Sequence, residues 1–187
     1  MKFPIKYNCL IQNEFINGNY KIVPLRYEDR IDIMKWRNEQ MYHLRQGETL
    51  TIESQEIYFK EMVASLFKQE KPGQLLFSYL NNDKCIGYGG LVHINWIDKN
   101  AEISFIMNTE LEEEKFQLHW SNYLQMIESV GFSELGFHKL YVYAFDLRPH
   151  LYKVLLDSNY FRDAILKEHC YFKDQFLDVI IHSKLKQ

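Results

Sequence analysis

Residues Lys84–Met107 read KCIGYGGLVHINWIDKNAEISFIM, and this stretch decides the fold class. Two segments of it, Lys84–Trp96 and Ala101–Met107, are rich in β-branched and aromatic residues. They predict two strands on either side of the turn signal Asp98-Lys99-Asn100. A further strand is predicted just before them, over 74–79. Three consecutive strands joined by short turns exclude a sheet in which every strand alternates with a helix.

Helical and strand patterns flank this core on both sides. A strand–helix–strand segment near the C-terminus requires some parallel pairing. We therefore expect an α/β (α+β) fold, with a mixed, twisted central sheet of about seven strands and helices on both faces. We expect a single domain over residues 1–187, with residues 1–16 as a lead-in. The other predicted elements are strand 20–25, helices 26–38, 53–68 and 114–130, strand 138–144, helix 149–158, and strands 160–170 and 176–182.

Composition narrows the class of protein. Hydrophobic residues make up 47% and charged residues 25% of the 187, which is typical of a packed core rather than of disorder. The net charge of −3 indicates no basic face for nucleic acid, and no apolar stretch reaches the length of a membrane span. We expect a cytoplasmic protein. Three dispersed cysteines and seven histidines without metal-site spacing lead us to expect no metal.

The order of the predicted elements resembles that of the GNAT superfamily of N-acetyltransferases. Within it, the chain resembles the acetyltransferases of pseudaminic acid biosynthesis, which act on an amino group of a nucleotide-linked sugar. It is similar, more distantly, to the N-terminal acetyltransferases of ribosomal proteins. The resemblance covers about residues 20 to 185. The motifs that carry it are Trp36-Arg37-Asn38, Lys84–Gly90, His93–Trp96, Leu166–Phe172 and Phe176–Ile180.

The resemblance implies acetyl-CoA as cosubstrate and a V-shaped split in the sheet, between the strands predicted at 101–107 and 138–144. The pantetheine arm of CoA would enter the split and bond to the backbone of Phe105, Ile106 and Met107. This is physically reasonable, because a splayed strand leaves unpaired N–H and C=O groups that an amide-rich ligand can satisfy.

The phosphate-binding segment departs from the family's Gln/Arg-x-x-Gly-x-Gly/Ala pattern. Residues 109–122 contain no glycine and four glutamates. Acidic residues favour the first turn of a helix, but each carboxylate close to a phosphate costs about 1 kcal/mol in an exposed setting. The candidates for holding the phosphates are Gln117, His119, Trp120, Ser121 and Asn122.

Three residues are candidates for acid–base chemistry. Glu102, early in the strand beside the split, is a candidate base for the incoming amine, and a solvent-facing position is its alternative. His93 is the alternative base, since histidine titrates near neutral pH, and a structural role is equally open to it. Leu156 stands where the family often has a tyrosine acid, so Tyr152, one turn earlier, is the candidate acid or else a packing residue.

The acceptor side is predicted at the end of the first helix and in the loop after it, over 39–50. Arg37 could bind a substrate phosphate or compensate the helix C-terminus. The candidate substrate-binding residues are Trp36, Arg37, Asn38, Tyr42 and His43.

The resemblance implies transfer of an acetyl group from acetyl-CoA to a primary amine, with an amino sugar nucleotide as the preferred acceptor. We expect direct transfer, because no Cys or Ser of the chain stands in a nucleophile motif. Protein N-terminal and polyamine amines are alternative acceptors. A GNAT-shaped binding module that has lost its cofactor is the alternative from a different class, and the glycine-free segment favours it. A structural subunit is the third alternative, and a homodimer is also left open.

Overall fold

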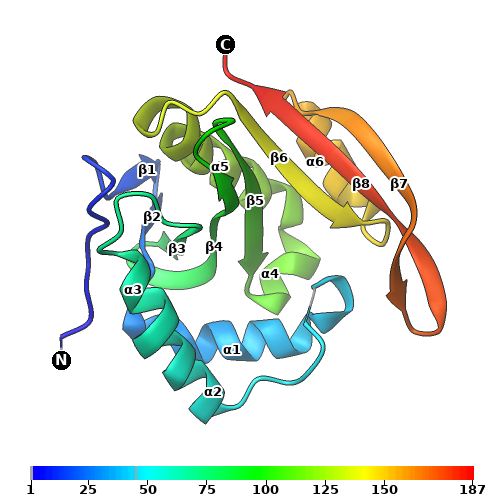
Figure 1. Ribbon diagram of the computed structural model, residues 1–187. Coiled ribbons are helices and arrows are strands. Elements are labelled where there is room, and N and C mark those ends of the chain that lie inside the picture. Colours follow the sequence, from blue (N-terminus) through cyan, green and yellow to red (C-terminus); the bar gives the residue numbers. More distant parts are fainter. Residues whose placement is uncertain (1, 45) are drawn as a thin grey trace.

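The computed structural model describes residues 2–44 and 46–187. Within them, eight strands form one sheet in the order β1-β2-β3-β4-β5-β6-β8-β7 (Figure 1). All neighbouring strands pair antiparallel except β5 and β6, which pair parallel. The strands are β1 (Phe15–Asn17), β2 (Tyr20–Pro24), β3 (Leu75–Asn81), β4 (Lys84–Asn95), β5 (Asn100–Met107), β6 (Lys139–Phe145), β7 (Phe161–Phe172) and β8 (Gln175–Leu185).

Helices cover both faces of this sheet. In Figure 1, α5 and α6 lie behind the strands, whereas α1 and the helix formed by α2, η3 and α3 lie in front. None of the helices in the described residues is long and apolar enough to cross a membrane. The helices are η1 (Tyr27–Asp29), α1 (Arg30–Glu39), η2 (Met41–His43), α2 (Ile52–Ile57), η3 (Tyr58–Val63), α3 (Ala64–Leu66), α4 (Thr109–Glu114), α5 (Phe116–Glu128), η4 (Ser129–Glu134) and α6 (Pro149–Asp157).

The predicted mixed sheet with helices on both faces is confirmed, with two differences in detail. The sheet has an eighth strand, β1, because the lead-in turns back at Gly18 and pairs with β2. The segment expected to be a phosphate loop forms α4, in which Asn108 caps the helix by accepting from the N–H of Glu110. Glu110 and Glu112 lie in the first turn of α4, where acidic side chains favour a helix.

A buried carboxylate fixes the start of α1 to the sheet. Asp29 is 4% exposed and receives two hydrogen bonds from the Arg26 guanidinium, at 2.7 and 2.8 Å. Its Oδ2 also accepts from the Ser78 hydroxyl of β3 at 2.6 Å. A buried charge is tolerated when its lone pairs are satisfied in this way. The position of α1, and of the loop that follows it, is therefore set by Asp29.

The parallel pairing of β5 with β6 is short. It joins Asn100 to Lys139, Ala101 to Leu140 and Glu102 to Tyr141, and no pairing joins the two strands beyond these in the described part of the chain. In Figure 1 the two strands diverge from that point. The split predicted between these two strands is confirmed.

Aromatic packing under β5 requires glycine in the neighbouring strand. Phe105 stacks on Tyr123 of α5, with ring centroids 3.9 Å apart. A Cβ at Gly89 of β4 would lie 2.1 Å from the Ser104 carbonyl oxygen and 2.6 Å from the Tyr123 hydroxyl oxygen. Only a residue without Cβ lets β4, β5 and α5 approach this closely.

We therefore expect Gly89→Ala to lower the free energy of unfolding by about 1–3 kcal/mol, the usual cost of overpacking. Urea denaturation followed by circular dichroism measures this change. Gly73→Ala is the matched control, because nothing lies within 4 Å of a Cβ built there. Equal unfolding midpoints for the two variants would show that β4 can move away from α5 without cost.

Candidate active site

A cavity of about 400 Å³ lies where β5 and β6 separate. We call it the cleft. Its walls come from six elements (α1, η2, β4, β5, α5 and β6), from Leu44 and Gln74 in loops, and from the residue before α6, so residues distant in the sequence meet there. The lining residues are Arg37, His43, Leu44, Gln74, Val92, His93, Glu102, Ile103, Ser104, Phe105, Trp120, Val142, Tyr143, Ala144, Phe145 and Arg148.

His93 and Glu102 form a pair in the cleft. The pairing of β4 with β5 is interrupted after Val92, and His93 adopts a left-handed φ of 48°. The His93 Nδ1 atom lies 2.8 Å from Glu102 Oε2. Glu102 is 5% exposed, whereas the His93 side chain is 59% exposed. Because the carboxylate accepts from Nδ1–H, the Nε2 atom is left as a proton acceptor.

The sequence offered these two residues as alternative bases, and the structure joins them in one unit. Glu102 does not face solvent, which was the alternative considered for it. A bulge places one extra residue in a strand and re-aims its side chains. The interruption in β4 brings His93 to the same face as Glu102, which simple strand alternation would not predict.

The backbone of β5 presents hydrogen-bonding groups to the split. Asn108 donates its N–H to the Ile86 carbonyl of β4. Successive residues of a strand direct their N–H and C=O groups to alternate edges. Phe105 and Met107 therefore direct these groups toward the split, and Ile106 directs its own toward β4.

Two further groups show what a ligand in the split would meet. The Met107 carbonyl accepts from Gln40 Nε2 at 2.8 Å, so the N–H of Met107 and both backbone groups of Phe105 are the β5 groups that remain for a ligand in the described part of the chain. Trp120 is 2% exposed, lines the cleft, and its Nε1–H has no hydrogen-bond partner within the described residues. Buried donors without partners are rare. A ligand arm that carries amide groups fits this site. Its N–H and C=O groups could bond to the backbone of β5, and one of its carbonyls could accept from the Trp120 indole.

An ion pair contributes one of its members to the wall of the cleft. Arg148 precedes α6 and its Nη1 donates to Glu112 Oε1 of α4 at 3.0 Å. The two side chains are 10% and 8% exposed, so the pair is shielded from water. The Arg148 guanidinium also lies 5.9 Å from the centre of the Phe116 ring. Arg148 carried no signal in the sequence, because nothing local distinguishes it from a surface arginine.

The residues predicted to hold phosphates are not grouped at the cleft. Trp120 lines it, but His119 points to the other side of α5, where its Nδ1 lies 3.0 Å from the Tyr79 hydroxyl. Asn122 accepts from Asn17 of β1, and Gln117 is hydrogen-bonded to Asp157 of α6. Ser121 is half-buried and is not among the cleft residues. Successive helical residues lie about 100° apart, so they cannot all face one ligand.

Tyr152 is placed away from the reaction space. Its hydroxyl donates to Asp146 Oδ1 at 2.9 Å, and its ring stacks on His182 with centroids 5.2 Å apart. Burial and the nearby carboxylate raise the pKa of Tyr152. Among the described residues that line the cleft, Tyr152 is absent. Its position favours the packing role over the acid role.

The Trp36-Arg37-Asn38 motif divides between core, cleft and loop. Trp36 is 5% exposed in the hydrophobic core. Arg37 lines the cleft and donates to the Tyr88 hydroxyl at 2.6 Å. Asn38 binds the N–H and the carbonyl of Leu50, both at 2.9 Å, and so shapes the loop after α1. The predicted loop 39–50 includes Arg45, which lies outside the described residues.

His43 is a neutral group in the cleft. Burial, with a smaller contribution from the positive charge of Arg148, lowers its pKa to about 3. Its Nε2 atom lies 3.2 Å from Gln40 Oε1. An imidazole that stays uncharged at neutral pH can contact a cationic amine without repelling it.

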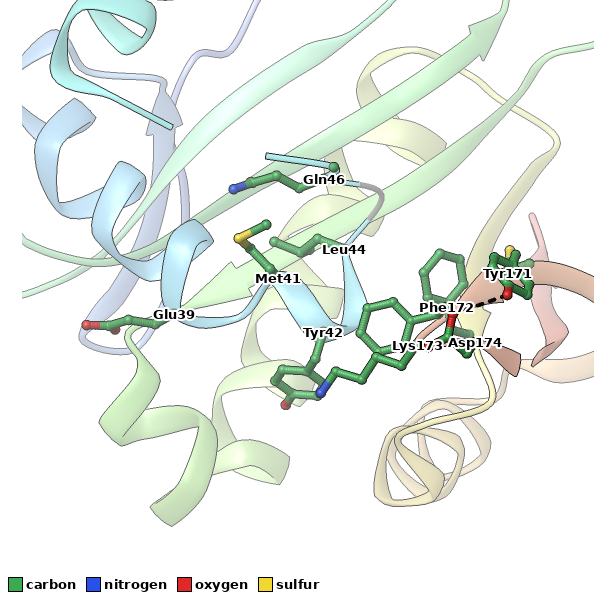
Figure 2. Close-up of a pocket in the computed structure, with 12 residues that line it drawn as sticks. Glu39, Met41, Tyr42, Leu44, Gln46, Tyr171, Phe172, Lys173 and Asp174 are labelled. Atoms are coloured by element: carbon green, nitrogen blue, oxygen red, sulfur yellow. Dashed lines mark hydrogen bonds between the residues drawn. The ribbon is translucent and has the colours of Figure 1, made fainter. Parts of the chain in front are cut away.

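A second pocket of about 920 Å³ adjoins the cleft and shares Leu44 and Phe145 with it. We call it the acceptor pocket. Figure 2 shows Tyr42 on one side and the β7–β8 hairpin on the other, with Lys173 extending toward Tyr42. The other lining residues are Glu39, Met41, Gln46, Gly47, Cys170, Tyr171, Phe172 and Asp174. No cluster of His, Cys, Asp or Glu in the described part of the chain is arranged to hold a metal.

Several solved structures share this fold. The spermidine N-acetyltransferase of Vibrio cholerae in complex with CoA and spermine is 18% identical, and the alignment covers 91% of this chain and 97% of that one with a TM-score of 0.78. A dodecameric structure of the Vibrio cholerae enzyme in an intermediate state is 18% identical over 91% and 95% of the chains, with a TM-score of 0.74. A probable acetyltransferase is 15% identical over 91% and 94%, also with a TM-score of 0.74. At these identities the likeness is one of fold.

Family membership comes from the sequence. No curated protein sequence matches the chain significantly. The profile of the acetyltransferase (GNAT) domain matches residues 22–181, which include the split, the His93–Glu102 pair, β7 and most of β8. The chain therefore belongs to the GNAT family of acetyl-CoA-dependent N-acetyltransferases.

Proposed function

We propose that this protein transfers an acetyl group from acetyl-CoA to a primary amine in the cleft between β5 and β6. The observation that carries the proposal is the three-residue pairing of these strands, beside which lies the His93–Glu102 pair. The split provides room and backbone partners for the thioester arm. The pair provides a proton acceptor at the same place.

The cofactor arm would lie along β5. The backbone N–H and C=O of Phe105 face the split. The Met107 carbonyl could accept a hydrogen bond from the arm if Gln40 Nε2 no longer donated to it. Ile106 would contribute through its side chain or not at all, because its backbone belongs to the β4 ladder. The Trp120 indole would donate to a carbonyl of the arm. This would satisfy the one buried side-chain donor on the cleft wall that has no partner among the described residues.

The proposed reaction is a direct transfer. His93 Nε2 accepts a proton from the amine, and Glu102 holds the ring by its Nδ1–H and stabilises the resulting imidazolium. The amine nitrogen attacks the thioester carbonyl carbon, a backbone N–H of β5 stabilises the oxyanion, and the C–S bond then breaks. The attacking nitrogen then loses its second excess proton, which passes through water to the leaving thiolate, so an ammonium acceptor gives one proton to His93 and one to the thiol product. An alkyl thiol, with a pKa of about 8.5 in cysteine, needs little assistance near neutral pH.

The preferred acceptor is an amine on a nucleotide-linked sugar. Tyr42, Tyr171 and Phe172 give the acceptor pocket aromatic faces of the kind on which sugar rings and bases stack. Lys173 extends across it and would pair with a phosphate (Figure 2). The pocket's volume of about 920 Å³ suits a ligand of this size.

A polyamine is the second candidate acceptor. Glu39 and Asp174 also line the acceptor pocket, and carboxylates attract a chain of ammonium groups. Both carboxylates have other partners: Glu39 accepts from Thr109, and Asp174 from the Tyr171 hydroxyl. The spermidine N-acetyltransferases that share the fold also favour this candidate.

We expect saturating acetyl-CoA to raise the melting temperature of the purified protein by roughly 5–10 °C. A ligand at about 100 times its Kd adds about 2.7 kcal/mol, and each kcal/mol is worth about 2–4 °C for a domain of this size. Differential scanning fluorimetry measures the shift, with CoA as a second ligand and ATP as the control. No shift with millimolar acetyl-CoA or CoA would leave the binding-module alternative.

His93→Gln should lower kcat by about 10²–10⁴-fold near neutral pH, the usual contribution of a general base, with little change in the KM of acetyl-CoA. The loss should shrink as pH rises toward the pKa of the free amine, because a deprotonated acceptor needs no base. Glu102→Gln should reduce kcat in the same direction but less. His138→Gln, which changes an exposed histidine outside the cleft, is the control. A loss in His93→Gln that is constant with pH would contradict the base role.

Lys173→Gln should raise the KM for a nucleotide-linked amino sugar by about tenfold, because one charge-assisted contact to phosphate is lost. The KM for spermidine should stay constant or fall, since a positive charge is removed. Steady-state kinetics with both acceptors test this, with Lys71→Gln, an exposed lysine outside the acceptor pocket, as control. If the enzyme acetylates spermidine but not the nucleotide-linked amino sugar, the polyamine is the acceptor and the amino sugar proposal is wrong.

A further inference from the structure

The segment after β5 is poorly suited to bind the diphosphate of a cofactor by itself. It has no glycine, forms the six-residue helix α4, and carries four glutamates. Glycines let a backbone approach phosphates closely, and carboxylates repel them. A protein that binds acetyl-CoA with this segment therefore needs positive charge from another element.

Arg148 is a buried cation at the place where this charge is needed. Its side chain is 10% exposed and lines the cleft. A guanidinium has five N–H donors, and Arg148 uses one, to Glu112, among the described residues. Arg37, another arginine of the cleft, already donates from Nε and Nη1 to Gln46 and Tyr88. Of the two arginines, Arg148 thus has more donors to spare among the described residues.

We propose that Arg148 binds the diphosphate of acetyl-CoA, and that Glu112 occupies the same guanidinium when the cofactor is absent. This inference rests on the proposed function. Glu112 and a diphosphate would be alternative anions for one buried cation, and a phosphate accepts two parallel bonds from a guanidinium where the carboxylate here accepts one. Binding exchanges one charge pair for another.

The geometry of α4 allows Glu112 to move away from Arg148. Lys115 separates α4 from α5 with non-helical φ and ψ of −134° and 28°. The start of α4 is tied to Gln40 through Thr109, but Glu112 provides its link to Arg148 and α6. When Arg148 turns to a phosphate, α4 can pivot at Lys115 and carry Glu112 into water. The carboxylate is then not left buried without a partner.

The first test compares Glu112→Gln with Glu113→Gln by isothermal titration calorimetry. Both remove one negative charge from α4, but Glu113 is exposed and has no ion pair in the described part of the chain. Glu112→Gln should bind CoA about tenfold more tightly than the wild-type protein, the worth of one charge-assisted hydrogen bond. Glu113→Gln should match the wild type. Pantetheine, which has the same arm and no diphosphate, should bind all three proteins equally.

The second test isolates Arg148. The double variant Glu112→Gln/Arg148→Gln differs from Glu112→Gln by the guanidinium alone, and it leaves no buried charge unpaired. It should bind CoA at least about tenfold more weakly than Glu112→Gln, with pantetheine binding unchanged. Arg162→Gln, an exposed arginine of β7, is the control for loss of positive charge. Circular dichroism confirms that each variant is folded.

The outcomes separate this inference from the proposed function. If CoA binds the wild-type protein, but Glu112→Gln equals Glu113→Gln or the double variant equals Glu112→Gln, the role of Arg148 is overturned and the function stands. If neither the wild-type protein nor any variant binds CoA at millimolar concentration, both proposals fail. An increase for Glu112→Gln that disappears in the double variant supports both.

Discussion

The separation of β5 from β6 is the constraint on which the rest of the structure depends. Parallel pairing ends at Glu102, and the interruption in β4 lies at the same level, since Val92 is the residue paired with Glu102 on the other side. A bulge bends its strand and increases the local twist. The bend turns the end of β5 away from β6, and the cleft opens where the two strands no longer share hydrogen bonds.

The same irregularity also forms the proposed catalytic pair. His93 lies within the interruption, and its left-handed backbone aims the imidazole at a buried carboxylate. One local departure from regular strand geometry therefore opens the site and equips it with a base. Backbone strain of this kind is retained where the surroundings hold it in place. Here the surroundings include the tight packing of Gly89 and Phe105 against α5.

Two kinds of group set the electrostatics of the cleft. Neutral His43 and the aromatic side chains of the acceptor pocket leave room for an amine. Arg148 and Glu112 keep opposite charges together away from water. A buried pair of this kind contributes little net stability, because desolvation offsets most of the attraction. The position of this pair beside the cleft therefore suggests that Arg148 is kept there to bind a ligand, and not that the pair stabilises the fold.

The sequence by itself determined the element order and the mixed sheet, because strand alternation, helical periodicity and turn residues are local properties. The position of the split followed from the resemblance of that order to the GNAT superfamily. The sequence also singled out His93, Glu102 and Trp120, which do line the cleft. Only the tertiary structure decided that His93 and Glu102 form one pair, that His119 and Asn122 face away, and that Arg148 meets Glu112. The first depends on the bulge in β4, the second on which face of α5 packs against the sheet, and the third on two residues 36 positions apart. None of these features leaves a local pattern in the chain.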